Sequence, residues 1–308
     1  MSEPLVWLPF DVSDLGEAPA GLRYERVDPT REVPDTVGDV RFYVPPYQLG
    51  SGIVEVMERM SSLEVVQLLT AGVDAVRGRV PDGVTLCNGR GIHDTSTAEL
   101  ALTLTLASLR GVPDFVRAQE RREWAAGWRP SLADKRVLLV GHGAIGRAIE
   151  ARLLPFECEV VRVARAAREE PEGHVHGFEE LPDLVPDVDV VVLVVPLTEE
   201  TRGLVDADLL ARMKDGALLV NVARGAVVDT DALLAELASG RLRAASDVFE
   251  DEPVPSDSPL WETPGLLMTP HVGGASSAMW PRAHRLVREQ LQRFAAGEEL
   301  ANVMSGEY

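Results

Sequence analysis

The chain has 308 residues, 45% hydrophobic and 26% charged, a globular composition long enough for two domains of about 100–200 residues each. Its formal net charge of −19 argues against nucleic acid and membranes as partners, because an acidic surface is repelled by DNA, RNA and anionic lipid. The longest apolar run, VDVVVLVVPL from Val188, is far shorter than the roughly 18 residues of a membrane-spanning helix, so we expect no transmembrane segment.

The first 97 residues predict short strands separated by turns. The runs LVWLPF, RFYVPP, EVVQLL and VTLC are apolar and bounded by turn residues, which is typical of strands. Residues 51–62 have a helix-like pattern, and Thr95–Arg110 is strongly helical, with an N-cap at Asp94 or Thr95. The charged stretch Gly111–Trp128, which holds two tryptophans, is expected to be an exposed arm or part of a subunit contact.

From Arg136 onward the sequence predicts a parallel sheet wrapped by helices. Strand-like runs alternate with helical patterns: RVLLVG, AIGRAIEARLLP, ECEVVRVA, VDVVVLVVP, ADLLARMK, GALLVNVA, TDALLAELASG, LRAASDVF and GLLMTP. The last stretch, WPRAHRLVREQLQRFAAG, predicts one amphipathic helix. We therefore expect an α/β fold with a Rossmann-type doubly wound domain in residues 98–276. Residues 1–97 and 277–308 are expected to form a second domain, with ligand bound in the cleft at the carboxyl ends of the strands.

A glycine-rich turn, GHGAIG, follows the strand-like run RVLLVG and opens a helix. This context makes the pattern specific for a dinucleotide. Gly141 permits the tight turn, Gly143 lets the backbone approach the pyrophosphate, and Gly146 allows close packing of helix and strand. The helix N-terminus, which includes Ala144 and Ile145, presents free N–H groups to the diphosphate.

The end of the next strand predicts which dinucleotide is bound. NAD-binding chains place an acid here, about 20 residues after the glycines, to hold the ribose 2′-hydroxyl. In this chain the strand ends at Ala164, followed by Arg165, so a 2′-phosphate meets no repulsion and gains a guanidinium donor. We expect NADP(H) to be preferred over NAD(H), with Arg147 and Arg168 as further candidates for the local positive charge. The alternative is that Arg165 is a solvated loop charge and NAD is used.

Three more segments, NVARGAVVD, SDVFEDEP and MTPHVGG, each follow a predicted strand. They bring one arginine, two candidate acids and one histidine to the same edge of the sheet. With these motifs the chain resembles the D-isomer-specific 2-hydroxyacid dehydrogenase family, which includes glyoxylate/hydroxypyruvate reductases. The resemblance runs nearly end to end, from TAGVD through GHGAIG, VPLTEETRGL and the three segments above to ELANV. It implies a flavodoxin-like second domain and a homodimer formed through Thr95–Arg110 and the arm that follows.

The resemblance also implies the roles of individual residues. It matches Arg224, Glu252 and His271 to the catalytic arginine, glutamate and histidine. It implies that Pro196, Thr201, Ala223 and Asp247 bind the cofactor. It also implies that Ala71, Gly72 and Val73 bind the substrate carboxylate. The chemistry suits these residue types. An arginine can polarise the ketone of a 2-oxo acid, and a histidine, whose pKa is ordinarily about 6.5, can exchange the proton.

The chain departs from the family pattern at two positions, and several other residues have different expected roles. The acid usual at the end of the second strand is absent, and Gly274 stands where some relatives have a serine. Glu250 and Asp251 are expected to be solvated and His93 to be a helix-entry residue, while Trp280 closes the substrate pocket or packs in a core or interface.

The sequence also bears on functions other than that of a reductase. The four tyrosines, at positions 24, 43, 47 and 308, lie outside the nucleotide-binding half, which excludes short-chain dehydrogenase chemistry. No H-E-x-x-H motif, cysteine cluster or G-x-S-x-G motif indicates a metal site or a hydrolase. The open alternatives are a cofactor-sensing scaffold of the corepressor type, or a relative acting on formate, phosphite or phosphoglycerate.

The expected compartment is the cytoplasm. The N-terminus does not predict a signal peptide. The two cysteines, Cys87 and Cys158, have neither metal nor redox spacing and are expected to be buried thiols in a reducing setting.

Overall fold

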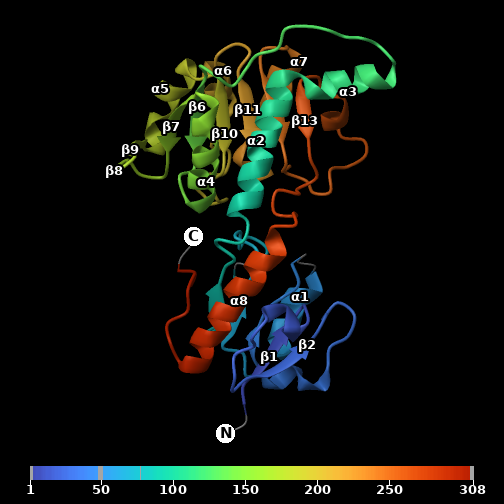
Figure 1. Cartoon of the computed structure of the whole chain (residues 1–308), viewed down its shortest axis with the longest axis vertical. Helices are drawn as coiled ribbons and strands as arrows, with labels where there is room; N and C mark the ends of the chain where they lie inside the picture. The colour runs from blue at the N-terminus through green and yellow to red at the C-terminus, as the bar shows by residue number, and fades with distance from the viewer. Residues whose placement is uncertain (1–2, 48–50, 77, 306–308) are drawn as a thin grey trace. The chain divides into compact units, whose positions relative to one another are not determined.

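The computed structural model describes residues 3–47, 51–76 and 78–305. The chain divides into two compact units, residues 1–93 with 277–308 and residues 94–276 (Figure 1). Each unit is built around its own largely parallel sheet, so the expected α/β fold with a Rossmann-type and a smaller domain is confirmed.

The larger unit contains an eight-stranded sheet in the order β13-β12-β11-β10-β6-β7-β9-β8, in which only β8 is antiparallel to its neighbour. The strands are β6 (Arg136–Val140), β7 (Glu159–Val163), β8 (Arg168–Glu170), β9 (Gly173–His176), β10 (Val190–Leu193), β11 (Leu218–Asn221), β12 (Arg243–Ser246) and β13 (Leu266–Met268). The chain winds outward from β6 to β7 on one side and from β10 to β13 on the other. The switch point between β6 and β10 is where such sheets bind ligands.

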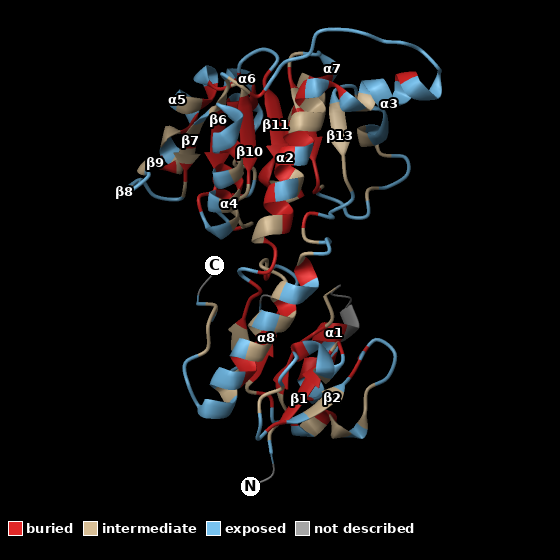
Figure 2. Cartoon of the chain, in the orientation of Figure 1, coloured by how far each residue is buried: buried red, intermediate tan, exposed pale blue. Residues whose placement is uncertain are grey.

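Helices cover both faces of this sheet because the strand residues alternate between two apolar cores. Val137 and Leu139 of β6 belong to the core under α2 (Asp94–Arg110) and α4 (Ala144–Leu153). Leu138 and Val140 belong to the opposite core, under α5 (Leu181–Leu184), α6 (Ala207–Arg212) and α7 (Thr230–Ala238). Burial on both faces explains the continuous apolar runs of the central strands, which are buried in Figure 2.

The smaller unit has five parallel strands in the order β2-β1-β3-β4-β5, which is the flavodoxin order. They are β1 (Leu5–Leu8), β2 (Arg23–Arg26), β3 (Val40–Tyr43), β4 (Val65–Gln67) and β5 (Thr85–Cys87). One face packs on α1 (Ser51–Glu55) and the turn after it. The other face packs on the C-terminal helix α8 (Met279–Ala296).

The helix α8 is joined to the smaller sheet by polar as well as apolar contacts. Val287 and Leu291 are fully buried in the core that it shares with β1 and β3. The buried Gln290 side chain donates hydrogen bonds to Oε1 of Gln67 at 2.7 Å and to the Ala301 carbonyl at 2.8 Å. The C-terminal helix therefore covers one face of a sheet formed by the first 93 residues.

The structure adds elements that the sequence patterns do not predict. The strands β2, β8 and β9 carry mostly polar residues, and α3 (Val112–Glu120) occupies the first half of the expected arm. Residues 121–130 after it contain no helix or strand, and the side chains of Trp124 and Trp128 are 97% and 99% exposed. Cys87 is buried as expected, whereas Cys158 is only partly buried. Within the described residues, no helix is both long and apolar enough to cross a membrane.

Candidate active site

Three loops at one edge of the larger sheet carry the expected catalytic side chains. Arg224 follows β11, Glu252 follows β12, and His271 follows β13. The three strands are adjacent and parallel, so their carboxyl ends lie side by side. The fold thus places a guanidinium, a carboxylate and an imidazole on neighbouring loops.

His271 and Glu252 form a direct pair. Nδ1 of His271 lies 2.5 Å from Oε2 of Glu252, while Oε1 of the glutamate accepts the Phe249 backbone N–H at 2.9 Å. The glutamate is therefore fixed at both oxygens, and it orients the ring through Nδ1. This leaves Nε2 of His271 as the ring atom that can exchange a proton with a ligand.

Asp247 supports the loop that carries His271. Its buried carboxylate accepts hydrogen bonds from the Thr269 hydroxyl at 2.6 Å, the Val272 N–H at 2.9 Å and the Gly273 N–H at 2.7 Å. The Asp247 carbonyl also accepts the His271 N–H at 2.8 Å. These contacts hold His271 in the left-handed region, at a φ of 51°, which a residue without glycine's freedom rarely adopts.

The arginine loop is fixed by Asn221, the last residue of β11. Its side chain accepts the Ala223 N–H and donates to the Arg224 carbonyl, both at 3.0 Å. The guanidinium of Arg224 donates to the Ala223 carbonyl at 2.7 Å. The next residue, Gly225, lies against the backbone of Phe249, where an added Cβ would be 1.9 Å from the Phe249 carbonyl carbon. The arginine loop therefore packs directly on the loop that carries Glu252.

The glycine turn lies between β6 and α4, at the switch point of the sheet. Gly141 has a φ of +113°, and an added Cβ would lie 2.8 Å from the Val194 carbonyl carbon. A Cβ on Gly146 would lie 2.0 Å from the Gly141 carbonyl oxygen, whereas one on Gly143 would meet nothing within 4 Å. Two glycines therefore permit close packing, and the third leaves open space before the first turn of α4. Ala144 and Ile145 begin that turn, so the loop fits a diphosphate at a helix N-terminus.

A largely buried hydrogen-bond network of His142, Glu150 and Arg162 supports the glycine turn. His142, inside the turn, forms a 2.7 Å hydrogen bond through Nε2 with Glu150, which also accepts from Arg162 Nε at 2.6 Å. Burial alone would raise the pKa of the Glu150 carboxyl, but the hydrogen bonds from Arg162 and His142 outweigh it and hold the pKa below its ordinary value. The ionised carboxylate therefore ties the turn to α4 and β7.

The arginines expected near the cofactor have acidic partners. Arg165 follows β7 and pairs with Glu200 at 3.2 Å, both side chains being more than half exposed. Arg168, at the start of β8, donates to Glu170 at 2.7 Å and to the His142 carbonyl of the glycine turn at 3.3 Å. Arg147 in α4 donates to both oxygens of Glu170.

The remaining expected cofactor positions lie in turns near the same edge. Ala164 is the first residue after β7, and its N–H donates to the His176 carbonyl at 2.9 Å. Pro196 lies three residues after β10, and its carbonyl accepts the hydroxyl of the buried Thr201 at 2.6 Å. Ala223 is buried beside Asn221.

The expected substrate positions lie in the smaller unit. Ala71, Gly72 and Val73 form the loop after β4, where Asn88 donates to the Ala71 carbonyl at 3.0 Å and Thr70 donates to the Gly72 carbonyl at 2.8 Å. In the same unit, His93 is buried and Nε2 contacts the Leu69 carbonyl at 2.8 Å, while Trp280 packs edge-on against Phe10.

Sequence reasoning missed several of the residues that shape this site. Glu150 and Glu200 lie 8 to 35 positions from the histidine and arginines that they bind, and Glu170 binds Arg147 from 23 positions away. The Asn221 side chain carries a clearer signal, because an asparagine at a strand end commonly bonds backbone groups of the following turn.

Comparisons with known proteins show what the chain is similar to. Residues 102–273 match the family model described as D-isomer specific 2-hydroxyacid dehydrogenase, NAD binding domain. The chain is 35% identical over 257 residues to a glyoxylate reductase of Pyrococcus horikoshii, an alignment that spans 79% of this chain and 77% of that protein.

Two solved structures resemble the whole chain. One is a D-isomer specific 2-hydroxyacid dehydrogenase from Xanthobacter autotrophicus in complex with NADPH and MES, with a TM-score of 0.81, 33% identity and coverage of 99% of this chain and 98% of that one. The other is an NADPH-dependent glyoxylate/hydroxypyruvate reductase from Sinorhizobium meliloti in complex with NADP and sulfate, with a TM-score of 0.83, 26% identity and coverage of 98% of both chains.

Proposed function

Because the chain belongs to the D-isomer specific 2-hydroxyacid dehydrogenase family, we propose that it reduces a small 2-oxo acid, such as glyoxylate or hydroxypyruvate, with NADPH. The chain is an NAD(P)-dependent oxidoreductase acting on CH–OH groups. The observation that carries the proposal is the 2.5 Å pair of His271 and Glu252 on loops adjacent to that of Arg224.

The residues of the chain have separate tasks in this reaction. The nicotinamide cofactor, when bound, supplies the hydride for the carbonyl carbon. Arg224 binds the substrate through a planar fork that suits a carboxylate and a neighbouring ketone oxygen, and it stabilises the negative charge that develops on that oxygen. His271 donates the proton from Nε2 to the same oxygen. Glu252 holds the ring through Nδ1 and stabilises its charged form.

The glycine turn and the loop after β7 are the parts of the chain that hold the dinucleotide in this proposal. Gly141, Gly143 and Gly146 leave the N-terminus of α4 open to the diphosphate. Ala144, Ile145, Ala164, Pro196, Thr201 and Ala223 line the remaining positions. Asp247 acts by fixing the His271 loop, and Ala71, Gly72 and Val73 present backbone groups to the substrate carboxylate.

The test of the catalytic assignment is substitution of His271. We expect His271→Gln to lower kcat by about 10²–10⁴-fold, because proton transfer by a positioned histidine contributes that much. The binding of NADPH, measured by fluorescence, should stay close to wild type. Near-normal turnover of the variant on glyoxylate, hydroxypyruvate, pyruvate and phenylpyruvate would remove His271 from the mechanism.

The preference for NADPH is proposed from Arg165 and Arg168. The pair between Arg165 and Glu200 is solvent-exposed and contributes about 0–1 kcal/mol, so a 2′-phosphate can displace the glutamate at little cost. Arg168 already contacts the glycine turn. In this proposal both guanidinium groups bind the 2′-phosphate beside the diphosphate.

Two variants test the preference in opposite directions. We expect Arg165→Ala to lower kcat/KM for NADPH about 10–100-fold, because a hydrogen bond to a charged group contributes about 1.5–3 kcal/mol. The same change should alter kcat/KM for NADH little. Glu200→Gln removes the competing acid and should raise kcat/KM for NADPH. A wild-type kcat/KM about tenfold higher with NADH than with NADPH would contradict the proposal.

We also propose that the protein acts as a homodimer through α2, α3 and residues 121–130. Trp124 and Trp128 are almost completely exposed, and Val112 and Val116 of α3 are about half exposed. Large exposed apolar side chains gathered on one segment are typical of a protein–protein interface. Light scattering should give twice the 33.4 kDa mass of the chain, and Trp124→Ala with Trp128→Ala should shift the equilibrium toward monomer.

A further inference from the structure

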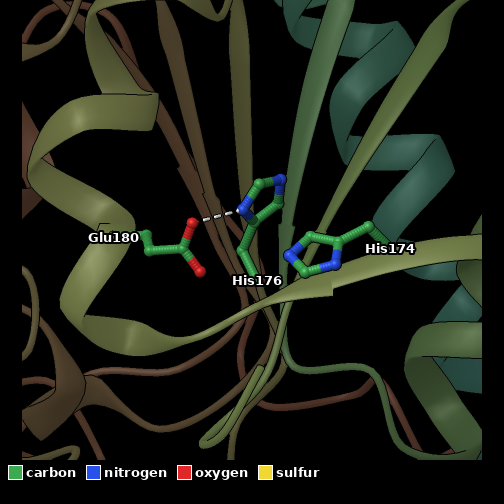
Figure 3. A group of neighbouring side chains, drawn as sticks. All are labelled: His174, His176 and Glu180. Atoms are coloured by element: carbon green, nitrogen blue, oxygen red, sulfur yellow. Dashed lines mark hydrogen bonds and ion pairs between the residues drawn. The ribbon is translucent and has the colours of Figure 1, made fainter. Parts of the chain in front are cut away.

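The strand β9, which lies next to the outermost strand β8 of the larger sheet, carries a second group of histidines, apart from the catalytic loops. His174 and His176 alternate with Val175 on β9, so their side chains project from the same face of the strand. Glu180 follows in the short turn after the strand. One ligand atom from each of the three side chains lies within 4.8 Å of the others (Figure 3).

The present contacts already point these side chains at one another. His176 Nδ1 lies 2.7 Å from Oε2 of Glu180, whose other oxygen accepts the Gly177 N–H at 2.9 Å. The two imidazole rings meet edge to face, with centroids 4.5 Å apart. On the neighbouring strand β8, Glu169 is paired in register with His174, and its carboxylate lies 2.7 Å from His174 Nδ1.

We propose that His174, His176 and Glu180 bind a divalent cation of the Zn²⁺ class, and that Glu169 orients the His174 ring through Nδ1. Two imidazoles with carboxylates are a ligand set suited to Zn²⁺, Ni²⁺ and Co²⁺ rather than to Mg²⁺ or Ca²⁺, which prefer oxygen alone. Metal–nitrogen distances of about 2.0–2.1 Å place the ligands of a tetrahedral ion roughly 3.3 Å apart. The three side chains therefore need only small rotations to close around an ion.

The backbone around the site is well suited to hold it. Val175, between the two histidines, is fully buried in the sheet, and the His176 carbonyl accepts the Ala164 N–H at 2.9 Å. Glu180 is held by the Gly177 N–H at the start of its turn. A bound cation would link β9 directly to the following turn, and to β8 through the hydrogen bond between Glu169 and His174.

The site lies outside the proposed catalytic machinery but adjoins the cofactor end of β7. His176 pairs with Val163, the last residue of β7, and β8 begins with Arg168, which contacts the glycine turn. A cation that fixes the β8–β9 pair would also fix the position of Arg168. The primary consequence is structural, and it is measurable without any assay of turnover.

The experiment is a titration of Zn²⁺ into chelator-treated full-length protein without a polyhistidine tag, followed by calorimetry. We expect one Zn²⁺ per chain and a rise in the midpoint of thermal unfolding. Co²⁺ in its place should give the visible absorption of a site with nitrogen and oxygen ligands. His174→Ala with His176→Ala should weaken binding at least about 10²-fold, since ligand loss exceeds the effect of losing an outer partner, and should abolish the thermal shift.

Matched variants identify the ligands. Glu180→Gln should weaken Zn²⁺ binding, while Glu179→Gln, a change of the adjacent exposed acid, should leave it unchanged. His271→Ala should also retain the binding, because the pair of His271 and Glu252 is not part of the proposed site. Circular dichroism shows that each variant is folded. Stoichiometric binding that survives the double histidine change, binding lost with His271→Ala, or no binding by the wild type would each overturn the proposal.

Discussion

Gly225 and Phe249 are in direct backbone contact, since a Cβ added to Gly225 would lie 1.9 Å from the Phe249 carbonyl carbon. This contact sets the spacing between the loop of Arg224 and the loop of Glu252. Gly225→Ala must therefore separate the two loops, and a displacement of about 1 Å can cost about 10²-fold in rate. We expect kcat/KM to fall by about that factor in a folded protein.

The control for this change is Gly240→Ala. Gly240 has a φ of +73°, but an added Cβ would meet nothing within 4 Å. The alanine should therefore reduce the thermal midpoint through backbone strain and leave kcat/KM near wild type. Equal loss of activity in both variants would show that Gly225 has no special role in spacing the loops.

Glu252 is expected to act through His271. Glu252→Gln keeps the size of the side chain, but it removes the charge and can favour the wrong tautomer of the ring, so we expect kcat to fall at least about 10²-fold with little change in NADPH binding. Glu250→Gln, a change of an exposed acid in the same loop, should have little effect on kcat. Steady-state kinetics of the two variants compares them directly, and similar rates would contradict the assignment.

Asp247 is expected to contribute to stability because its carboxylate accepts three hydrogen bonds inside the protein. Asp247→Asn places an amide NH₂ group opposite backbone N–H donors and should lower the free energy of unfolding by about 3 kcal/mol. Urea denaturation measures this change. If Asp247 instead acts mainly on the cofactor, stability will be near wild type and only the KM for the cofactor will rise.

Glu170 gives the stability a dependence on pH. Hydrogen bonds from Arg147 and then Arg168 lower the pKa of its carboxyl from 4.5 to about 2. Because the folded-state pKa is depressed, the ionised group stabilises the fold fully above pH 4.5, and this contribution is lost as the pH falls toward 2. The difference in unfolding free energy between wild type and Glu170→Gln should therefore be constant near neutral pH and shrink below pH 4.5.

The control for the pH experiment is Glu172→Gln, in the exposed turn between β8 and β9. Its difference from wild type should be small and should show no comparable loss in the acid range. A Glu170→Gln difference that stays constant from neutral pH down to pH 3 would show that the two arginines do not favour the ionised form of Glu170.

Most strands and long helices could be predicted because their apolar residues recur with the period of the element. The central strands β6, β10 and β11 are almost continuous apolar runs, since both of their faces are covered. The strand β2 reads RYER, and β8 with β9 reads REE and GHVH. These strands lie at a sheet edge or next to one and carry polar residues, so they lack that signal.

The site was predictable where a chemical motif is local in sequence. The glycine turn and the order of Arg224, Glu252 and His271 along successive strands are visible in the chain itself. The partners of Arg165, Arg168 and His142 are not visible in the sequence. Arg165 and Glu200, for example, follow β7 and β10, and they come together only when these two strands join the same sheet. The group of His174, His176 and Glu180 was not predicted, because β9 itself was not predicted.

The hydrogen bond from Gln290 to Gln67 has a consequence for synthesis on the ribosome. The first 93 residues leave the ribosome early, but one face of their sheet has no cover until α8 has been made. All of the larger unit, residues 94–276, is translated in the interval. The inserted unit can therefore fold first, and the N-terminal strands must wait with an apolar surface exposed, which makes them the part of the nascent chain most in need of a chaperone.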